Sequence, residues 1–427
     1  MVRSRAIDAT EPRTVVLRSH ATATRCQPFC QTIDCDLSIR PSHPLAAIRL
    51  QDIVMNKRQG GERIMGLGGG LVSQESQRNL KIAEDLCQKR KPKQALPYLV
   101  KAMEDPNNLD ADVQFSFLQP NLNMSIKVLE DAERKGRATL QSIFGPRVFD
   151  DDSDGDEVGR FWTLIETRPY MRVLQAIVRI AFEKGDYNKS ANTMIEMLRL
   201  CPGDNMGQRQ WLGSVLLQAG RNKEALSFAQ AWLQPRIRET GEAPPRGGCA
   251  FKAPSPDPIP QAEFEKMSDY CDGDLLYTGA LAAFKIWGSE SLLARQYLRL
   301  GAKNNFSILM RILGKVTRPH ALNNLPRTPN GPEQAHDYLW LTQNLWEKPD
   351  VWAWADGDEA KAYVRKTCSR AGCEQREERS VQFKRCSACK RVSYCSPQCQ
   401  KSDWKAHKPA CKDYLETKEM TRAMMQG

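Results

Sequence analysis

Cysteine and histidine side chains gather near the end of the chain in four closely spaced pairs. The pairs are Cys368 and Cys373, Cys386 and Cys389, Cys395 and Cys399, and His407 and Cys411. Eight donors of this kind fill two tetrahedral zinc sites with none left over. Sulfur-rich tetrahedral ligand sets favour zinc over other metals. Because both sites would be filled by protein, no position remains for a catalytic water, and we expect two structural Zn²⁺ ions.

The place of the histidine distinguishes the classes of zinc module. It is the seventh of the eight ligands, and the segments "YC" at 394–395 and "CQKSDWKAHK" at 399–408 surround it. This pattern resembles a MYND-type zinc finger over residues 365–412, whereas RING and PHD modules have their histidine fourth or fifth. The gap of four residues in the first pair is wider than the usual two. The resemblance implies a cross-braced order, in which alternate pairs share a metal. One zinc would be held by Cys368, Cys373, Cys395 and Cys399, and the other by Cys386, Cys389, His407 and Cys411.

Local patterns predict the elements that position these ligands. Ser396 and Pro397 are an N-cap followed by proline at the first helical position, which predicts a short helix from about 397 to 407. The segment "KRVSY" before Cys395 alternates as a short strand does. A module of this size buries too little apolar surface to fold alone, so metal binding must supply free energy of folding.

The resemblance also implies a function. MYND-type fingers bind short proline-containing peptides along the strand and against a glutamine and a tryptophan of the helix. The matching positions here are Val392, Ser393, Gln400 and Trp404. An exposed indole stacks on proline rings, and a strand edge offers main-chain hydrogen bonds. The alternatives are that Trp404 fills the core between the zinc sites and that Gln400 is an ordinary solvated residue.

Two other functions have some support in the sequence. The finger is basic, so it could contact nucleic acid as part of a transcriptional regulator, through residues such as Lys384, Arg385, Lys390, Arg391, Lys401, Lys405 and Lys408. A remoter alternative is a lysine methyltransferase-related protein, because MYND fingers are inserted in some SET-domain enzymes. Against it, only 16 residues follow Cys411, and the chain has no Asn-His dipeptide. No nucleophile motif lies near a histidine, so we expect no enzyme activity.

The positive charge is concentrated in the tail, and cysteine usage indicates an intracellular protein. The formal net charge is +11, and residues 361–427 hold 16 Lys and Arg against 7 Asp and Glu. Half of the 14 cysteines fall between Cys368 and Cys411, and an odd cluster with a histidine is a poor disulfide framework. No apolar stretch is long enough to span a membrane, and no signal peptide is visible. We therefore expect the nucleus or the cytoplasm and no membrane partner.

The middle of the chain has helical periodicity. Apolar residues at spacings of three and four predict helical hairpins near 77–103, 171–200, 206–233 and 273–301, and a further helix that docks through Tyr338, Leu339, Leu341 and Leu345. Gly185 aligns with Gly220 and Ser190 with Ala225, an internal period of 35 that resembles tetratricopeptide-like repeats. Such hairpins stack into an all-α repeat domain with a groove that suits a second partner.

These patterns divide the chain into four parts. Residues 1–76 are expected to be a disordered N-terminal segment and residues 77–355 the tetratricopeptide-like helical domain, with exposed linkers at about 149–159 and 241–261. Residues 365–412 form the finger and 413–427 a C-terminal tail. The acidic linker resembles a calcium loop, but Phe161 occupies the position of its bidentate carboxylate, which favours a solvated loop. The sequence therefore predicts an adaptor protein that joins two partners.

Overall fold

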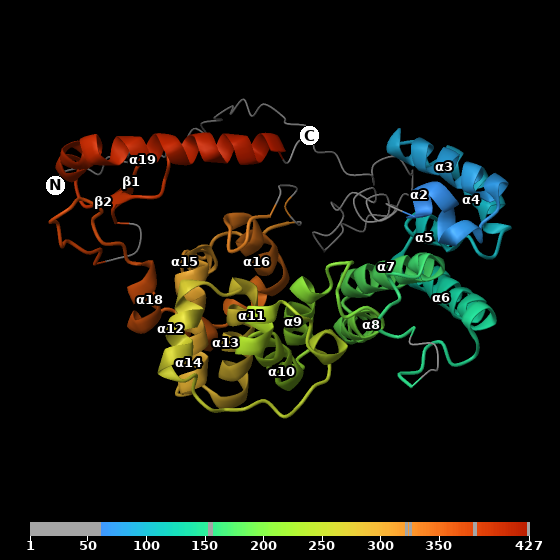
Figure 1. The fold of residues 1–427 in the computed structure, drawn as a ribbon, viewed down its shortest axis with the longest axis horizontal. Helices are drawn as coiled ribbons and strands as arrows, with labels where there is room; N and C mark the ends of the chain where they lie inside the picture. The colour runs from blue at the N-terminus through green and yellow to red at the C-terminus, as the bar shows by residue number, and fades with distance from the viewer. Residues whose placement is uncertain (1–60, 153–156, 321–322, 324–326, 379–381, 425–427) are drawn as a thin grey trace, which may run out of the picture.

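The fold is mostly helical, with a small two-stranded sheet near the C-terminus (Figure 1). The structure is a computed structural model and describes residues 61–152, 157–320, 323, 327–378 and 382–424. The mostly helical architecture with a C-terminal finger was predicted from the sequence and is confirmed. The disorder expected for residues 1–60 lies outside the described residues.

The helical part runs from α2 to α18. Its elements are α2 (Gly61–Met65), η2 (Leu67–Gly70), α3 (Gln74–Gln88), α4 (Pro92–Met103), α5 (Leu109–Ser116), α6 (Leu122–Phe144), η3 (Ile165–Thr167), α7 (Arg168–Lys184), α8 (Tyr187–Leu200), α9 (Arg209–Gln218), α10 (Asn222–Trp232), α11 (Pro235–Thr240), η4 (Pro245–Gly248), α12 (Gln261–Asp269), α13 (Gly273–Trp287), α14 (Leu292–Asn304), α15 (Phe306–Leu313), α16 (Pro332–Trp346), α17 (Pro349–Ala355) and α18 (Asp358–Val364). The finger adds β1 (Lys384–Arg385), β2 (Ser393–Tyr394) and α19 (Pro397–Met424).

The predicted hairpins are present as α3/α4, α7/α8, α9/α10 and α13/α14. The turns of α7/α8 and α9/α10 explain the residues that recur with the period of 35. Gly185 and Gly220 follow α7 and α9 with φ of 83° and 72°, a conformation that glycine adopts without strain. Ser190 and Ala225, one turn into the next helix, are both fully buried. Small side chains at these positions let the two helices of each hairpin approach closely. The tetratricopeptide assignment itself remains a resemblance.

Helix α16 lies across the first helices of three hairpins. The Trp340 ring is 5.8 Å from Phe182 of α7 and 6.1 Å from Trp211 of α9, measured between centroids. Farther along α16, Trp346 is 5.8 Å from Tyr277 of α13. The four residues predicted to dock this helix are all buried: Tyr338, Leu339, Leu341 and Leu345. Helix α16 therefore covers the face that α7, α9 and α13 present to it.

The helical part begins earlier than the sequence predicts. Residues 61–76 were assigned to the disordered segment, but they form α2, η2 and the start of α3. Leu67 and Val72 are buried there, 7% and 3% exposed. Gly66, Gly68, Gly69 and Gly70 all have positive φ, so the chain folds back between α2 and α3. These glycines therefore make a compact turn in the segment that was predicted to be disordered.

A buried ion cluster fixes this first segment to the rest of the helical part. The Arg172 guanidinium donates to both Asp110 oxygens at 2.7 Å and to both Glu62 oxygens at 2.9 Å. The side chains of all three residues are at most 1% exposed. Glu62 also accepts a hydrogen bond from the Gly68 amide at 3.3 Å. Three elements far apart in sequence, α2, α5 and α7, thus meet at one bidentate cation.

Each of the two predicted linkers contains exposed residues and a few buried side chains that anchor it. In 241–261, Cys249 is 6% exposed, and Gly247 and Gly248 are buried beside Trp232, whose indole N–H donates to the Gly247 carbonyl at 3.0 Å. In the acidic linker, the described residue Phe149 is buried among aromatic rings. Its neighbour Asp151 accepts a hydrogen bond from Arg199 at 2.7 Å. The composition of these segments predicted exposure and could not identify the single side chains that anchor them.

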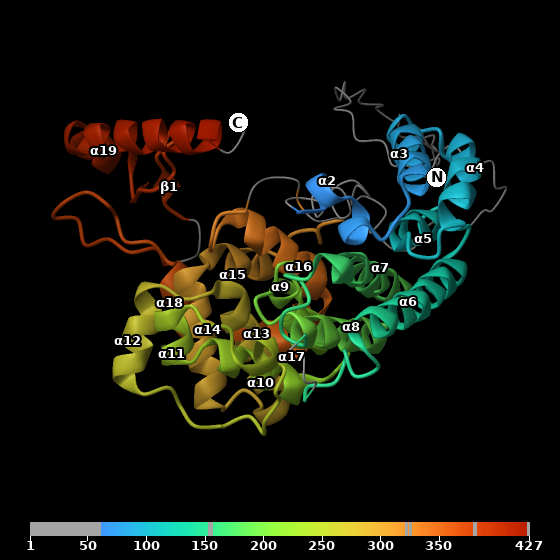
Figure 2. The ribbon, with the colours of Figure 1, turned by 45° about the vertical axis from the view of Figure 1, so that its right-hand side comes forward.

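The finger and the α3/α4 hairpin lie at opposite ends of the molecule (Figures 1 and 2). The chain reaches the finger through α18, and cations of the finger cover Phe306 of α15. Lys366 Nζ is 4.2 Å and the Arg385 guanidinium carbon 5.7 Å from the centre of that ring. Among the described residues, no helix combines the length and apolarity that crossing a membrane requires.

Helix α19 is longer than predicted. The sequence suggested a helix ending near 407 and a separate tail from 413, but α19 continues to Met424. Pro409 lies inside it, where proline costs a main-chain hydrogen bond. Good helix formers follow, in "KDYLETKEM", and Cys411 must stay in line with His407 to reach the second group of ligands. The helix propensity of the residues after Pro409 and the position required of Cys411 together favour continuation of the helix.

Candidate metal centre

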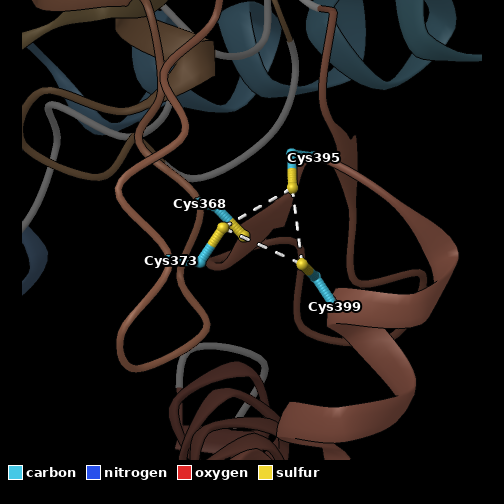
Figure 3. A group of neighbouring side chains, drawn as sticks. All are labelled: Cys368, Cys373, Cys395 and Cys399. Carbon is cyan, nitrogen blue, oxygen red and sulfur yellow. Dashed lines mark hydrogen bonds between the residues drawn. The ribbon is translucent and has the colours of Figure 1, made fainter.

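The first group of predicted ligands comes together around one point (Figure 3). The donor atoms of Cys368, Cys373, Cys395 and Cys399 all lie within 4.8 Å of one another. Between sulfurs, the distances are 3.7 Å for Cys373 and Cys395, 3.4 Å for Cys395 and Cys399, and 3.9 Å for Cys399 and Cys373. Zinc–sulfur bonds of about 2.3 Å in a tetrahedron place sulfurs about 3.8 Å apart. These three sulfurs therefore have the spacing of a zinc tetrahedron, and the Cys368 sulfur lies within 4.8 Å of each of them.

The second group is equally compact and more deeply buried. Cys386, Cys389, His407 and Cys411 again have all donor atoms within 4.8 Å of one another, and all four side chains are buried. The Cys386 and Cys411 sulfurs are 3.9 Å apart, and the Cys389 sulfur is 3.4 Å from His407 Nε2. A bound metal would thus be coordinated by Nε2 of this histidine. The two groups follow the alternating order along the chain that the resemblance implies.

A short antiparallel hairpin holds ligands of both groups in register. Lys384 pairs with Tyr394 and Arg385 with Ser393. Just beyond the pair, the Cys386 amide donates to the Val392 carbonyl at 3.0 Å. Strand β1 therefore leads into a ligand of the second group, and β2 leads into Cys395 of the first. Because the two paired strands lead into ligands of different groups, the ligand pairs alternate between the two groups along the chain.

The predicted helix start delivers the last ligands. Ser396 Oγ accepts a hydrogen bond from the Cys399 amide at 3.2 Å, as an N-cap does, and Pro397 opens α19. Cys399 thus lies in the first turn, where the helix dipole favours a thiolate. His407 and Cys411 follow at a spacing of four on one face of α19. One helix therefore supplies ligands to both groups.

In each group, hydrogen bonds favour the thiolate form of one cysteine. Burial alone would raise the pKa of Cys386, but hydrogen bonds from the Cys389 amide, from His407 and from the Ala388 amide lower that pKa to about 6. A hydrogen bond from the Gln375 amide lowers the pKa of Cys373 to about 7. Each group thus contains a cysteine that ionises readily near neutral pH. Together with the distances, the donor chemistry fits two structural zinc ions.

One structural residue of the finger was not found from the sequence. Glu377 is 3% exposed, and its carboxylate accepts the Lys366 amide and the Phe383 amide, each at 2.7 Å. Its own amide donates to the Lys366 carbonyl at 2.9 Å. This glutamate closes the loop that carries Cys368 and Cys373. It stands in the run "EQREE", where nothing distinguishes it from solvated neighbours.

The four residues expected to bind peptide do not share one environment. Trp404 is 43% exposed, and its ring centre is 6.0 Å from that of His407 in an edge contact. Val392 and Gln400 are half-buried. Ser393 is buried, and both of its main-chain groups bond to Ser369, the amide to Oγ at 3.0 Å and the carbonyl to the amide at 2.8 Å. The edge of β2 at Ser393 is therefore already paired.

Comparisons with known proteins agree on the same segment. Residues 367–411 match the family model of the MYND finger. An F-box protein of Arabidopsis thaliana is 51% identical over 45 residues, 10% of this chain and 13% of the relative. The SET domain and MYND-type zinc finger protein 6 of Schizosaccharomyces pombe is 45% identical over 47 residues, 11% and 10% of the two chains.

The match to a third protein is also short. The MYND-type zinc finger protein samB of Aspergillus clavatus is 41% identical over 54 residues, 13% of this chain and 9% of the relative. The chain thus matches only about a tenth of the length of these proteins. No solved structure matches the chain. The spacing, the converging donors and the family match lead to one conclusion: over residues 367–411 this chain carries a MYND finger, a protein-interaction module with two clusters that can bind two zinc ions.

Proposed function

We propose that this protein is an intracellular, zinc-dependent adaptor whose finger binds a proline-containing peptide and whose helical part binds a second protein. The observation that carries the proposal is the exposed Trp404 indole, held against the metal ligand His407. Because the ring is 43% exposed, a partner that covers it would gain free energy from burial of its apolar surface. Its fixed position lowers the entropy that binding would cost.

The chemistry of the surroundings supports a peptide. Gln400 lies one turn before Trp404 on the same face of α19, so an amide stands beside the indole. Proline rings stack on indole, and glutamine donates to and accepts from a peptide backbone. Because Ser393 is already bonded to Ser369, recognition would rest on these side chains and on Val392 and not on an added strand.

The surface for a second partner would lie outside the face that α16 covers. Helix α4 leaves Tyr98 and Val100 exposed on different sides, 36% and 56%, at the end of the molecule away from the finger. An adaptor with binding surfaces at its two ends joins partners without a clash between them. The sequence-based nucleic-acid alternative rests on the basic residues of the finger, and the experiment in the next subsection separates it from peptide binding.

Replacement of Trp404 tests the proposal. A peptide selected on the wild-type chain from a library with a central proline pair should bind Trp404→Ala about 30-fold more weakly, the loss typical of a tryptophan that anchors an interface. The zinc content should stay unchanged, because the indole is not a ligand. Isothermal titration gives the affinity, and elemental analysis gives the zinc.

The matched control is Met420→Ala. Met420 is an exposed apolar residue of the same helix, 61% exposed, outside the finger segment 367–411. This variant should bind the peptide as the wild type does. Equal affinities for Trp404→Ala and Met420→Ala would remove the indole, and with it the proposed peptide site.

A further inference from the structure

A stripe of lysines runs along α19 beside Trp404. The four residues Lys401, Lys405, Lys408 and Lys412 are spaced by four, three and four, so they share one face of the helix. All four are exposed. The stripe is about 16 Å long at 1.5 Å per residue. At 100° per residue, the middle of the stripe is turned about 150° from Cys399, about 130° from His407 and about 90° from Cys411.

The positive charge of the stripe is almost uncompensated. Lys412 forms an ion pair with Glu416 at 3.4 Å, whereas Lys401, Lys405 and Lys408 form none within the described part of the chain. The nearby carboxylate of Asp403 accepts a hydrogen bond from the Tyr394 hydroxyl at 2.8 Å. Lysines placed along one helix face repel one another, which is unfavourable unless an anion lies against them.

The metal ligands do not explain this charge. Cations that compensate zinc-bound thiolates must lie close to the sulfurs. Around the axis of α19, the stripe is turned by about 90° or more from each of the three ligands on this helix. Its charge therefore faces outward, toward a binding partner.

We infer that the lysine stripe recognises acidic residues that flank the proline motif, so that the partner is an acidic, proline-containing peptide. This inference rests on the proposed function of Trp404. Lys401 and Lys408 are three and four residues from Trp404, so they stand on either side of the indole along the helix. A peptide stacked on the ring would pass over both lysines.

The spacing of the stripe fits an extended peptide. Successive lysines are about 4.5 to 6 Å apart along the axis, and alternate side chains of an extended chain are about 6.6 Å apart. Each lysine can thus meet one carboxylate of an alternating acidic segment. Sequence-independent binding of single-stranded nucleic acid uses several aromatic rings for stacking. In the described finger, Trp404 is the one large aromatic side chain that is exposed, which favours the peptide.

The test starts from peptides chosen by the protein itself. A display library with a central proline pair and random flanks is selected on the full wild-type chain. The best peptide is then compared with a version in which every Asp and Glu is changed to Asn and Gln. Both are measured on the wild type, on Lys401→Gln/Lys405→Gln/Lys408→Gln, and on the control Lys81→Gln/Lys93→Gln/Lys101→Gln. The control removes the same charge from exposed lysines of α3 and α4.

The expected result is a preference for the acidic peptide that depends on the lysine stripe. The amide peptide should bind the wild type and the control about tenfold more weakly than the acidic peptide, the sum of a few exposed ion pairs. The stripe variant should bind both peptides equally. The preference of the wild type should shrink as salt is raised, because exposed charges are screened.

Three results would overturn the inference, and each leads to a different conclusion about the site. If the wild type binds both peptides equally while Trp404→Ala still weakens binding, the stripe has no role and the peptide site stands. If the library yields no peptide that prefers the wild type to Trp404→Ala, the proposed function fails as well. If a labelled DNA duplex binds through the stripe and the two peptides do not differ, the partner is nucleic acid.

Discussion

Chelation of zinc should unfold residues 367–411 and leave the helical part folded. The apolar core of the finger is small, because its two clusters consist largely of the ligands themselves, with Phe383 and Tyr394. Such a core cannot offset the entropy of chain ordering, so the folding free energy comes from the metal, about 10 kcal/mol or more per structural zinc. Hydrogen exchange after treatment with a chelator should show loss of protection at the amides of Cys386 and Cys399.

The helical part provides the internal control. Helices α7 and α13 belong to cores made of buried apolar side chains, and neither contains a metal ligand. Their amides should exchange at the same rates with and without the chelator. Unchanged protection throughout the finger would contradict a metal-dependent fold, because its amides would then be held by packing alone.

Replacement of Arg172 by methionine should cost about 3 to 5 kcal/mol of the free energy of unfolding of the helical part. The substitution leaves the Glu62 and Asp110 carboxylates buried without their shared cation. It also releases the contact that fixes residues 61–72 against α7. Denaturant unfolding followed by far-UV circular dichroism measures the loss.

Two variants make this prediction specific. Arg134→Met removes an arginine whose side chain is 68% exposed and which pairs with Asp131, so its effect should be below about 1 kcal/mol. The triple variant Glu62→Leu/Asp110→Leu/Arg172→Met replaces the whole cluster by apolar groups and should recover much of the stability. An Arg172→Met chain as stable as the wild type would show that the cluster contributes nothing to holding α2 in place.

The metal centre was largely predictable because its information is local. Pair spacing names the eight donors, and the seventh place of His407 selects the module. The proline and serine before Cys399 predict the start of α19. The helical hairpins were predictable for a similar reason, since their apolar period and their glycine turns lie within single segments.

The features that sequence reasoning missed depend on distant partners. Nothing near Glu62 shows that it will meet Arg172, which is 110 residues away in the chain. Periodicity marks α16 as a helix but not the three hairpins that it crosses. Helix α19 continues past Pro409 although proline disfavours a helix interior, because Cys411 must be placed beside the other ligands of its group. Glu377 is identified only by the two amides that it accepts.

The zinc content of two double variants tests directly whether alternate ligand pairs share a metal. The wild type should contain two zinc ions per chain. Cys368→Ser/Cys395→Ser disrupts one group and should retain one zinc. Cys368→Ser/Cys386→Ser disrupts both groups and should retain almost none. The reverse pattern, with one zinc kept in the second variant and none in the first, would mean that neighbouring pairs share a metal.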